Sequence, residues 1–130
     1  MSVELFDVLT FHRTEVDNID ITTTEPDWTD LMTLAVPALA TGVYGLVFSL
    51  QFTLNSTSQS FMYQFSLDGG ANWGPVYQKE VKDRSNIEVL EVLNLIDHTA
   101  GDLDIRCRVT REGSATCQVL KGLITCERKG

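Results

Sequence analysis

Basic residues are scarce in this sequence of 130 residues. It carries 10 Lys and Arg against 18 Asp and Glu, which gives a net charge of −8, and its pI is near 4.5. Phosphate contacts need clustered Lys and Arg, and an anionic lipid surface repels an acidic protein. We therefore expect neither nucleic acid nor a membrane as a partner.

Long apolar runs are missing as well. No stretch approaches the roughly 18 consecutive apolar residues that a membrane-spanning helix needs. The first residues, Met1 to Asp7, contain no basic segment followed by an apolar one. We therefore expect no signal peptide and synthesis in a cytoplasm.

Cysteine is rare, and its count is odd. Cys107, Cys117 and Cys126 leave at least one thiol unpaired, and their spacing matches no zinc-binding pattern. We interpret all three as reduced residues of the core, because free cysteine behaves as a small apolar side chain.

Residues in catalytic patterns are also lacking. The two histidines, His12 and His98, lie far apart in the chain, and we interpret the acidic residues around His98 as a solvated loop. No serine or cysteine stands in a nucleophile motif, and the sequence has no glycine-rich phosphate loop or cofactor motif. We therefore expect a protein that is not an enzyme, with no catalytic, cofactor or metal site.

A long alternating segment is the clearest feature that is present. From Val43 to Leu54 the even positions are all large and apolar, and from Val47 onward the other positions become polar. A period of two is typical of a strand with one buried face. At twice the usual strand length, this segment predicts a central strand of a large antiparallel sheet.

Shorter segments of the same kind fill the rest of the chain. We expect about eight strands in all, which is typical of a β-sandwich or barrel. Besides the central strand these are residues 19–24, 32–36, 61–67 (hairpinned to the central strand), 75–82, 87–96, 103–109 and 116–126, and they are preceded by residues 3–11 as an arm or edge strand. Residues 12–18 read as a polar loop, and the alternation slips near Lys121 and Gly122, which predicts a bulge.

Residues 87–96 fit two periods. Val89, Val92, Leu93 and Ile96 have helical spacing, but a strand with a bulge also fits, and the β-branched composition favours the strand. The sequence thus predicts an all-β antiparallel sandwich, with a jelly roll as the best fit and an immunoglobulin-like sandwich as the second choice. We divide it into an N-terminal arm or edge strand, residues 1–18, and one β-sandwich domain, residues 19–130.

The sharpest local motif is Ser66-Leu67-Asp68-Gly69-Gly70-Ala71-Asn72-Trp73. It resembles the Asp-box, Ser-x-Asp-x-Gly-x-x-Trp, of sialidase propellers and several unrelated β proteins. A propeller needs several copies, and here there is one. We therefore interpret Ser66, Asp68, Gly70 and Trp73 as a structural hairpin, in which the carboxylate accepts backbone N–H groups and the glycines supply positive φ. The alternative is a carbohydrate-contacting loop with Trp73 and Tyr77 as stacking platforms.

The second face of the central strand carries no charge. Its residues are Gly45, Val47, Ser49, Gln51 and Thr53. An uncharged outer face on a long strand is typical of a subunit interface, and we mark these five residues as a candidate interface.

Four segments together resemble small jelly-roll proteins of tailed-bacteriophage virions, and the tumour-necrosis-factor-like group in general. They are Trp28-Thr29-Asp30-Leu31, the run from Ala40 to Ser49, Phe65-Ser66-Leu67-Asp68-Gly69, and the run from His98 to Ile105. The resemblance spans roughly residues 28–127. It implies a capsid decoration (cement) protein or another accessory virion protein, and it implies no catalytic residues.

From these expectations we predict a virion structural protein that is made in a host cytoplasm. It would bind itself, as a homotrimer by analogy with the tumour-necrosis-factor-like group or else as a dimer, and it would bind the major capsid protein or another virion protein. The alternative is a carbohydrate-binding or receptor-binding module on a fibre or tail.

Overall fold

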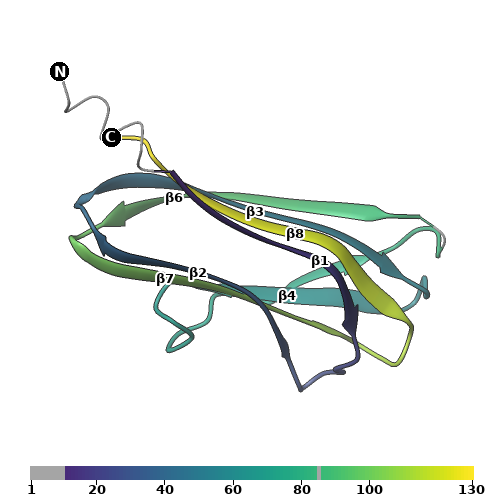
Figure 1. Cartoon of the computed structure of the whole chain (residues 1–130). Coiled ribbons are helices and arrows are strands. Elements are labelled where there is room, and N and C mark those ends of the chain that lie inside the picture. Colours follow the sequence, from purple (N-terminus) through teal and green to yellow (C-terminus); the bar gives the residue numbers. More distant parts are fainter. Residues whose placement is uncertain (1–10, 85) are drawn as a thin grey trace.

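A computed structural model describes residues 11–84 and 86–130. Within these ranges every regular element is a strand, and the strands form two stacked layers (Figure 1). The described residues contain no helix that could span a membrane. The strands are β1 (Phe11–Ile21), β2 (Thr29–Leu39), β3 (Gly42–Leu54), β4 (Ser60–Ser66), β5 (Tyr77–Glu80), β6 (Glu88–His98), β7 (Gly101–Arg111) and β8 (Cys117–Arg128).

The two layers are four-stranded antiparallel sheets with the strand orders β1-β8-β3-β6 and β2-β7-β4-β5. Most connections cross from one sheet to the other, and this interleaving makes the sandwich a jelly roll. The all-β class and the jelly-roll architecture predicted from the sequence are confirmed. We call the first layer the bare sheet and the second the loop-covered sheet, for reasons given below.

The core lies between the sheets and depends most on β3. All its even-numbered residues, from Tyr44 to Leu54, are at most 3% exposed, as the alternation predicts. Two aromatic pairs bridge the layers. The rings of Phe52 and Phe61 stack with centroids 4.1 Å apart, and those of Phe48 and Phe65 are 3.8 Å apart. These ring contacts pack the two sheets against each other.

Three local predictions are wrong. Residues 12–18 form no loop but pair with β8 as part of β1. β4 is not hairpinned to β3, since it lies in the other sheet between β5 and β7. The aromatic residues of the two strands therefore face each other across the core. Residues 88–98 are a strand, as predicted, but β6 pairs with β3 without the expected bulge.

The slip predicted near Lys121 and Gly122 is confirmed. The register between β3 and β8 shifts between Gln51 and Phe52, which pair with Lys121 and Val119. Residues 1–10 of the predicted arm lie outside the described residues, so the division of the chain at residue 18 stays a prediction.

Candidate functional site

The outer face of the bare sheet displays aliphatic side chains that nothing described in the chain covers. In β3 the outward residues are the predicted interface set, Gly45, Val47, Ser49, Gln51 and Thr53, and each is half-buried by its neighbours. Beside them β6 presents Val89, Leu93 and Leu95, which are 57%, 69% and 68% exposed. We call Val47, Val89, Leu93 and Leu95 the apolar patch.

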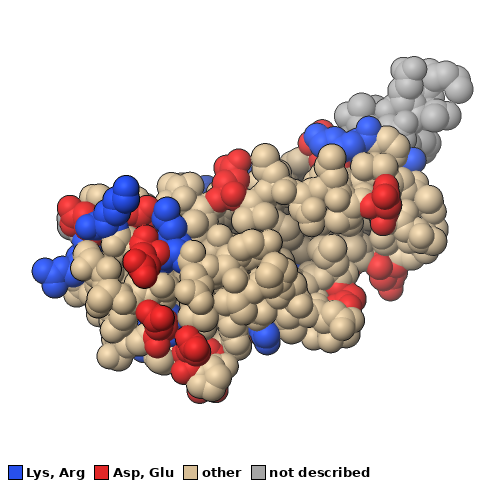
Figure 2. Space-filling model, turned by 180° about the vertical axis from the view of Figure 1, so that it is seen from behind, with Lys and Arg blue, Asp and Glu red and all other residues tan. Residues whose placement is uncertain are grey.

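The patch borders a shallow hollow of about 710 Å³ on this outer face. Gly45 and Val47 of β3, Leu93 and Leu95 of β6, and Thr125 of β8 line it. Glu127 and Lys129, whose charged groups lie 3.4 Å apart, also line it, and the Lys129 side chain lies against Gly45, where a Cβ atom would be 2.8 Å from it. Seen from the side of β6, uncharged surface fills the centre of the molecule, most charged residues gather toward its ends, and acidic side chains also stand along its upper edge (Figure 2).

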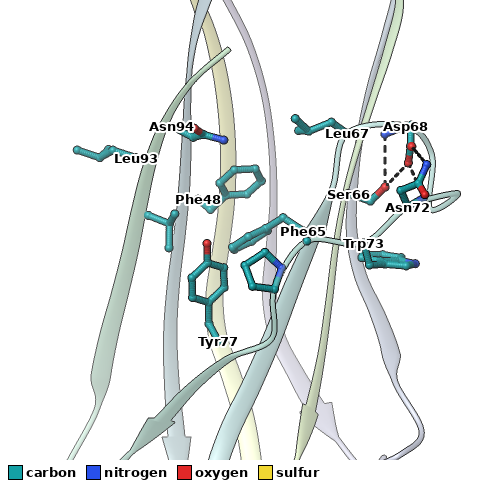
Figure 3. A pocket seen from close by; sticks show the side chains of 13 residues that line it. Phe48, Phe65, Ser66, Leu67, Asp68, Asn72, Trp73, Tyr77, Leu93 and Asn94 are labelled. Atoms are coloured by element: carbon teal, nitrogen blue, oxygen red, sulfur yellow. Dashed lines mark hydrogen bonds between the residues drawn. The ribbon is translucent and has the colours of Figure 1, made fainter.

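A second hollow, of about 440 Å³, opens between the edges of the two sheets. We call it the aromatic groove. Phe48, Phe65 and Tyr77 gather at its centre, and Asn94 of β6 lies on one side (Figure 3). Val92 of the same strand also lines it. One face of the Tyr77 ring stacks on Tyr63, with centroids 5.1 Å apart, and the residue is 37% exposed. The groove thus combines an apolar floor with an amide at its rim.

The Asp-box-like loop forms the opposite wall. The Ser66 hydroxyl donates to Asp68 Oδ1 (2.8 Å) and accepts the N–H of Gly70 (2.9 Å). Asp68 also accepts the side-chain and backbone N–H groups of Asn72, at 2.7 and 2.8 Å (Figure 3). These bonds lower the pKa of Asp68 to about 2. Gly69 and Gly70 have φ values of 72° and 90°, which glycine adopts readily.

Trp73 turns away from the aromatic groove centre and toward the outer face of the loop-covered sheet (Figure 3). The Arg108 guanidinium lies 4.0 Å from the centroid of the Trp73 ring and 4.8 Å from that of Trp28. Its Nε and Nη2 donate to Gln64 Oε1 at 2.9 and 2.7 Å. One face of Trp73 is thus occupied by the protein itself, and its role as a ligand platform stays a prediction.

Loops therefore cover the outer face of this sheet over β4 and part of β7, whereas Thr33 and Ala35 of β2 stay exposed. Gln64 Nε2 donates to the carbonyl of Gly74 (2.9 Å), and Thr110 donates to Thr23 (3.3 Å). The outward residues Met62, Gln64, Ser66 and Thr110 are all less than 9% exposed as a result. In the described part of the chain, no buried side-chain nitrogen or oxygen lacks a hydrogen-bond partner.

The three cysteines are free and buried. Burial raises the pKa of the Cys117 thiol to about 12 and also raises the pKa of Cys107 and Cys126. Among residues 11–84 and 86–130, no group of three or more His, Cys, Asp and Glu is placed to hold a metal ion. His98 Nε2 lies 3.1 Å from the carbonyl oxygen of Gly101, in the tight turn between β6 and β7.

No protein-family model and no curated protein sequence match the chain. Among solved structures it is similar to a mutant VP2 protein of infectious bursal disease virus in derived T=1 particles, with a TM-score of 0.65 and 9% identity over 91% of this chain and 32% of that one. The VP2 subviral particle of the same virus gives a TM-score of 0.60 and 8% identity, over 91% and 33%. The chain thus spans about a third of the length of these VP2 chains.

A tumour necrosis factor is also similar. Eiger TNF from S. frugiperda covers 92% of this chain and 86% of its own length at 11% identity, with a TM-score of 0.47. At these identities the VP2 superpositions show a shared jelly-roll fold, and the looser TNF superposition carries no argument.

The interface predicted from the sequence did not include the exposed residues of β6. It pointed to the outward side of β3, but Val89, Leu93 and Leu95 of the adjacent strand are far more exposed. The signal was present as an ambiguity. Residues 87–96 fit both a helix and a strand because both sides of β6 carry aliphatic residues, and a strand that is apolar on both sides has two faces to cover.

Proposed function

We propose that this chain is a non-enzymatic structural protein of a virion, which self-associates and decorates a capsid lattice as a cement protein. It would be made in a host cytoplasm and assembled onto the particle through the major capsid protein or another virion protein. The observation that carries the proposal is the apolar patch on the bare sheet.

The exposure of the patch supports a protein partner. Leu93 and Leu95 are more than two-thirds exposed, and they adjoin Val47 and a hollow of about 710 Å³. Contiguous apolar surface of this kind on a folded chain is typical of an interaction site, because leaving it in water costs about 25 cal/mol per Å². Glu91 shares this side of β6 between Val89 and Leu93, and the uncharged residues around Leu93 and Leu95 fit the core of an interface.

The fold supports the viral setting. The VP2 chains that share this jelly roll are those of T=1 and subviral particles. A jelly roll on its own is used by many unrelated proteins. The VP2 likeness therefore supports the proposal only in combination with the patch. The homotrimer expected from the sequence stays a prediction.

Co-sedimentation with empty shells of the major capsid protein encoded in the same genome tests the proposal. The native chain should sediment with the shells, and a Leu93→Lys, Leu95→Lys double variant should stay in the supernatant. The matched control is Thr33→Lys, Ala35→Lys on β2, which adds the same charge to exposed positions of the loop-covered sheet. Equal binding by the native chain and the patch variant would contradict the proposal.

A second candidate function is glycan binding, which the aromatic groove favours. The partly exposed Tyr77 ring and the Asn94 amide are the groups that a sugar ring stacks on and bonds to. A glycan array with the purified chain would reveal such a ligand. In that case Tyr77→Ala should abolish the signal and Tyr77→Phe, which keeps the ring, should retain it. An array without any signal would contradict glycan binding and would not affect the proposal of a virion protein.

A further inference from the structure

Four strands form the open edges of the two sheets: β1 and β6 in the bare sheet, and β2 and β5 in the loop-covered sheet. An edge strand presents unpaired N–H and C=O groups, and proteins interrupt such edges with bulges, prolines or short strands. Three of the four edges are interrupted here. β1 has Asn18 at a φ of 52°, β2 has Pro37 and two breaks in register, and β5 is only four residues long.

β6 has none of these interruptions. Its eleven residues contain no proline, and its pairing with β3 runs without a shift from Glu88 to His98. Its acidic residues are Glu88, Glu91 and Asp97, and none of them falls in the central run from Val92 to Ile96. Leu93 and Asn94 line both the aromatic groove and the outer hollow. The centre of β6 is therefore an uninterrupted, uncharged edge between two hollows.

We propose that a second copy of this chain pairs with the free edge of β6. The two β6 strands run antiparallel, with a twofold axis at Leu93. The pairing would join two four-stranded sheets into one sheet of eight strands. It rests on the self-association proposed above and gives that association a residue-level contact.

The charges on β6 select this register. In an antiparallel pair, residues opposite each other point to the same side, so a twofold axis perpendicular to the sheet passes through one residue. An axis at Leu93 pairs all eleven residues and places Glu88 opposite His98. An axis at Glu91 places that residue opposite its own copy, and an axis at Asn94 places Glu91 opposite Asp97. Like charges directly opposite are destabilising.

Other registers pair fewer residues. An axis at Val92 leaves Asp97 and His98 of each copy without a partner residue. The axis at Leu93 also keeps apolar residues together on the inner side, where Leu90 lies opposite Ile96. Both of these residues are half-buried against the core in the single chain. The second copy therefore extends the core as well as the backbone ladder.

Single cysteine substitutions test the register. With the axis at Leu93, the two Cα atoms at position 93 lie about 5 Å apart, which a disulfide spans. Position 95 lies opposite Glu91 of the second copy, so the two positions 95 are about 13 Å apart along the strands. On air oxidation Leu93→Cys should give a covalent dimer on a non-reducing gel, and Leu95→Cys should not.

Leu95→Cys is a matched control, because positions 93 and 95 lie on the same side of the same strand. Their side chains are also nearly equally exposed, at 69% and 68%. The native thiols are buried, so that only the introduced cysteine is free to cross-link. Equal cross-linking of the two variants, or of Leu95→Cys alone, would overturn the proposed register.

Single lysine substitutions test the same contact without a covalent bond. Leu93→Lys places two ammonium groups opposite each other on the axis and should weaken the dimer at least tenfold. Leu95→Lys places an ammonium group opposite Glu91 of the second copy and should leave the dimer intact. Analytical ultracentrifugation measures both. Equal weakening by the two substitutions would overturn the pairing.

The outcomes separate this inference from the proposed function. A mass of two chains with the predicted cross-link supports the pairing. A mass of three chains, with both lysine variants dissociated, overturns the β6 pairing and leaves the virion proposal standing. A native chain that stays monomeric at every concentration overturns the pairing and the self-association together.

Discussion

The two sheets of this sandwich treat their outer faces in opposite ways. On the loop-covered sheet, residues from the segments that precede β2 and β5 lie over β4 and β7, so that even the outward Gln64 and Thr110 are buried. On the bare sheet no described loop does this, and Leu93 and Leu95 remain more than two-thirds exposed. Both sheets share one core and have the same number of strands.

The difference shows which outward side chains are covered by other parts of the chain and which are left exposed to solvent. Arg108, held between two tryptophans and bonded to Gln64, is a polar residue that the chain's own loops satisfy. Leu93 is an apolar residue that the described chain leaves in water. Surface that is apolar, regular and uncovered is where a partner adds most stability. The bare sheet is therefore the side on which we place the partner.

The largest expected loss of stability comes from a substitution in the core that the two sheets share. Phe52 of the bare sheet is fully buried and stacks on Phe61 of the loop-covered sheet. Phe52→Ala should destabilise the fold by about 3–5 kcal/mol, because it opens a cavity between the layers. Urea unfolding followed by fluorescence and circular dichroism should show one transition at a lower midpoint. Two separate transitions would show that the sheets do not depend on one core.

A smaller effect should distinguish the two outer faces. Arg108→Met removes the guanidinium from between Trp28 and Trp73 and leaves Gln64 Oε1 without its donors. We expect a loss of about 1–3 kcal/mol in the free energy of unfolding. The matched change on the bare sheet, Gln51→Met, should stay within about 0.5 kcal/mol. Equal losses in chemical denaturation would remove the distinction between a covered and a bare face.

A pH-dependent effect should follow from Asp68, at the edge of the loop-covered sheet. The amide and backbone N–H of Asn72 and the Ser66 hydroxyl lower its pKa from 3.8 to about 2. Ionised Asp68 therefore stabilises the fold above its unfolded pKa, and this contribution is lost as the pH falls through about 2. The stability gap between the native chain and Asp68→Asn should be constant above about pH 5 and shrink toward pH 2.

Urea midpoints of the two proteins at pH 6 and pH 2.5 measure this gap. The bare sheet offers a control in Asp17→Asn, at an exposed position of β1. A gap for Asp68→Asn that does not change with pH would contradict the hydrogen-bonded role of the carboxylate.

The smallest effect is expected from the cysteines, which lie in the core between both sheets. Burial raises the pKa of all three thiols, so that they stay protonated and shielded at neutral pH. Labelling with a thiol reagent should modify no cysteine in the folded chain and all three in urea. Rapid labelling of Cys126 in the folded chain would show that the β8 side of the core opens readily.

Much of this fold could be predicted from alternation alone, because a strand with one buried face repeats every two residues. Val43 to Leu54 shows this period without interruption and is the central β3. Residues 12–18 do not, because β1 lies at an edge and its outward side carries charged residues that look like a loop. Pairing was harder, since a sequence does not show whether consecutive strands share a sheet or face each other.

Only one of the two strands of the candidate site could be predicted from the sequence, for a similar reason. The sequence identified the uncharged side of β3, whose residues are flanked by strands on both sides. The more exposed leucines belong to β6, and nothing in residues 87–96 indicates that this strand has a neighbour on one side only. Likewise, the sequence interprets Trp73 as part of a structural hairpin or else as a stacking platform, and it does not show that Arg108, 35 positions away in the chain, lies over the ring.

The most direct test of this account is the mass of the native chain in solution, by light scattering across the micromolar range. We predict a mass of twice the 14.5 kDa of one chain, because β6 offers one self-complementary edge. A mass of 14.5 kDa at every concentration would contradict the claim that the bare sheet needs a second copy.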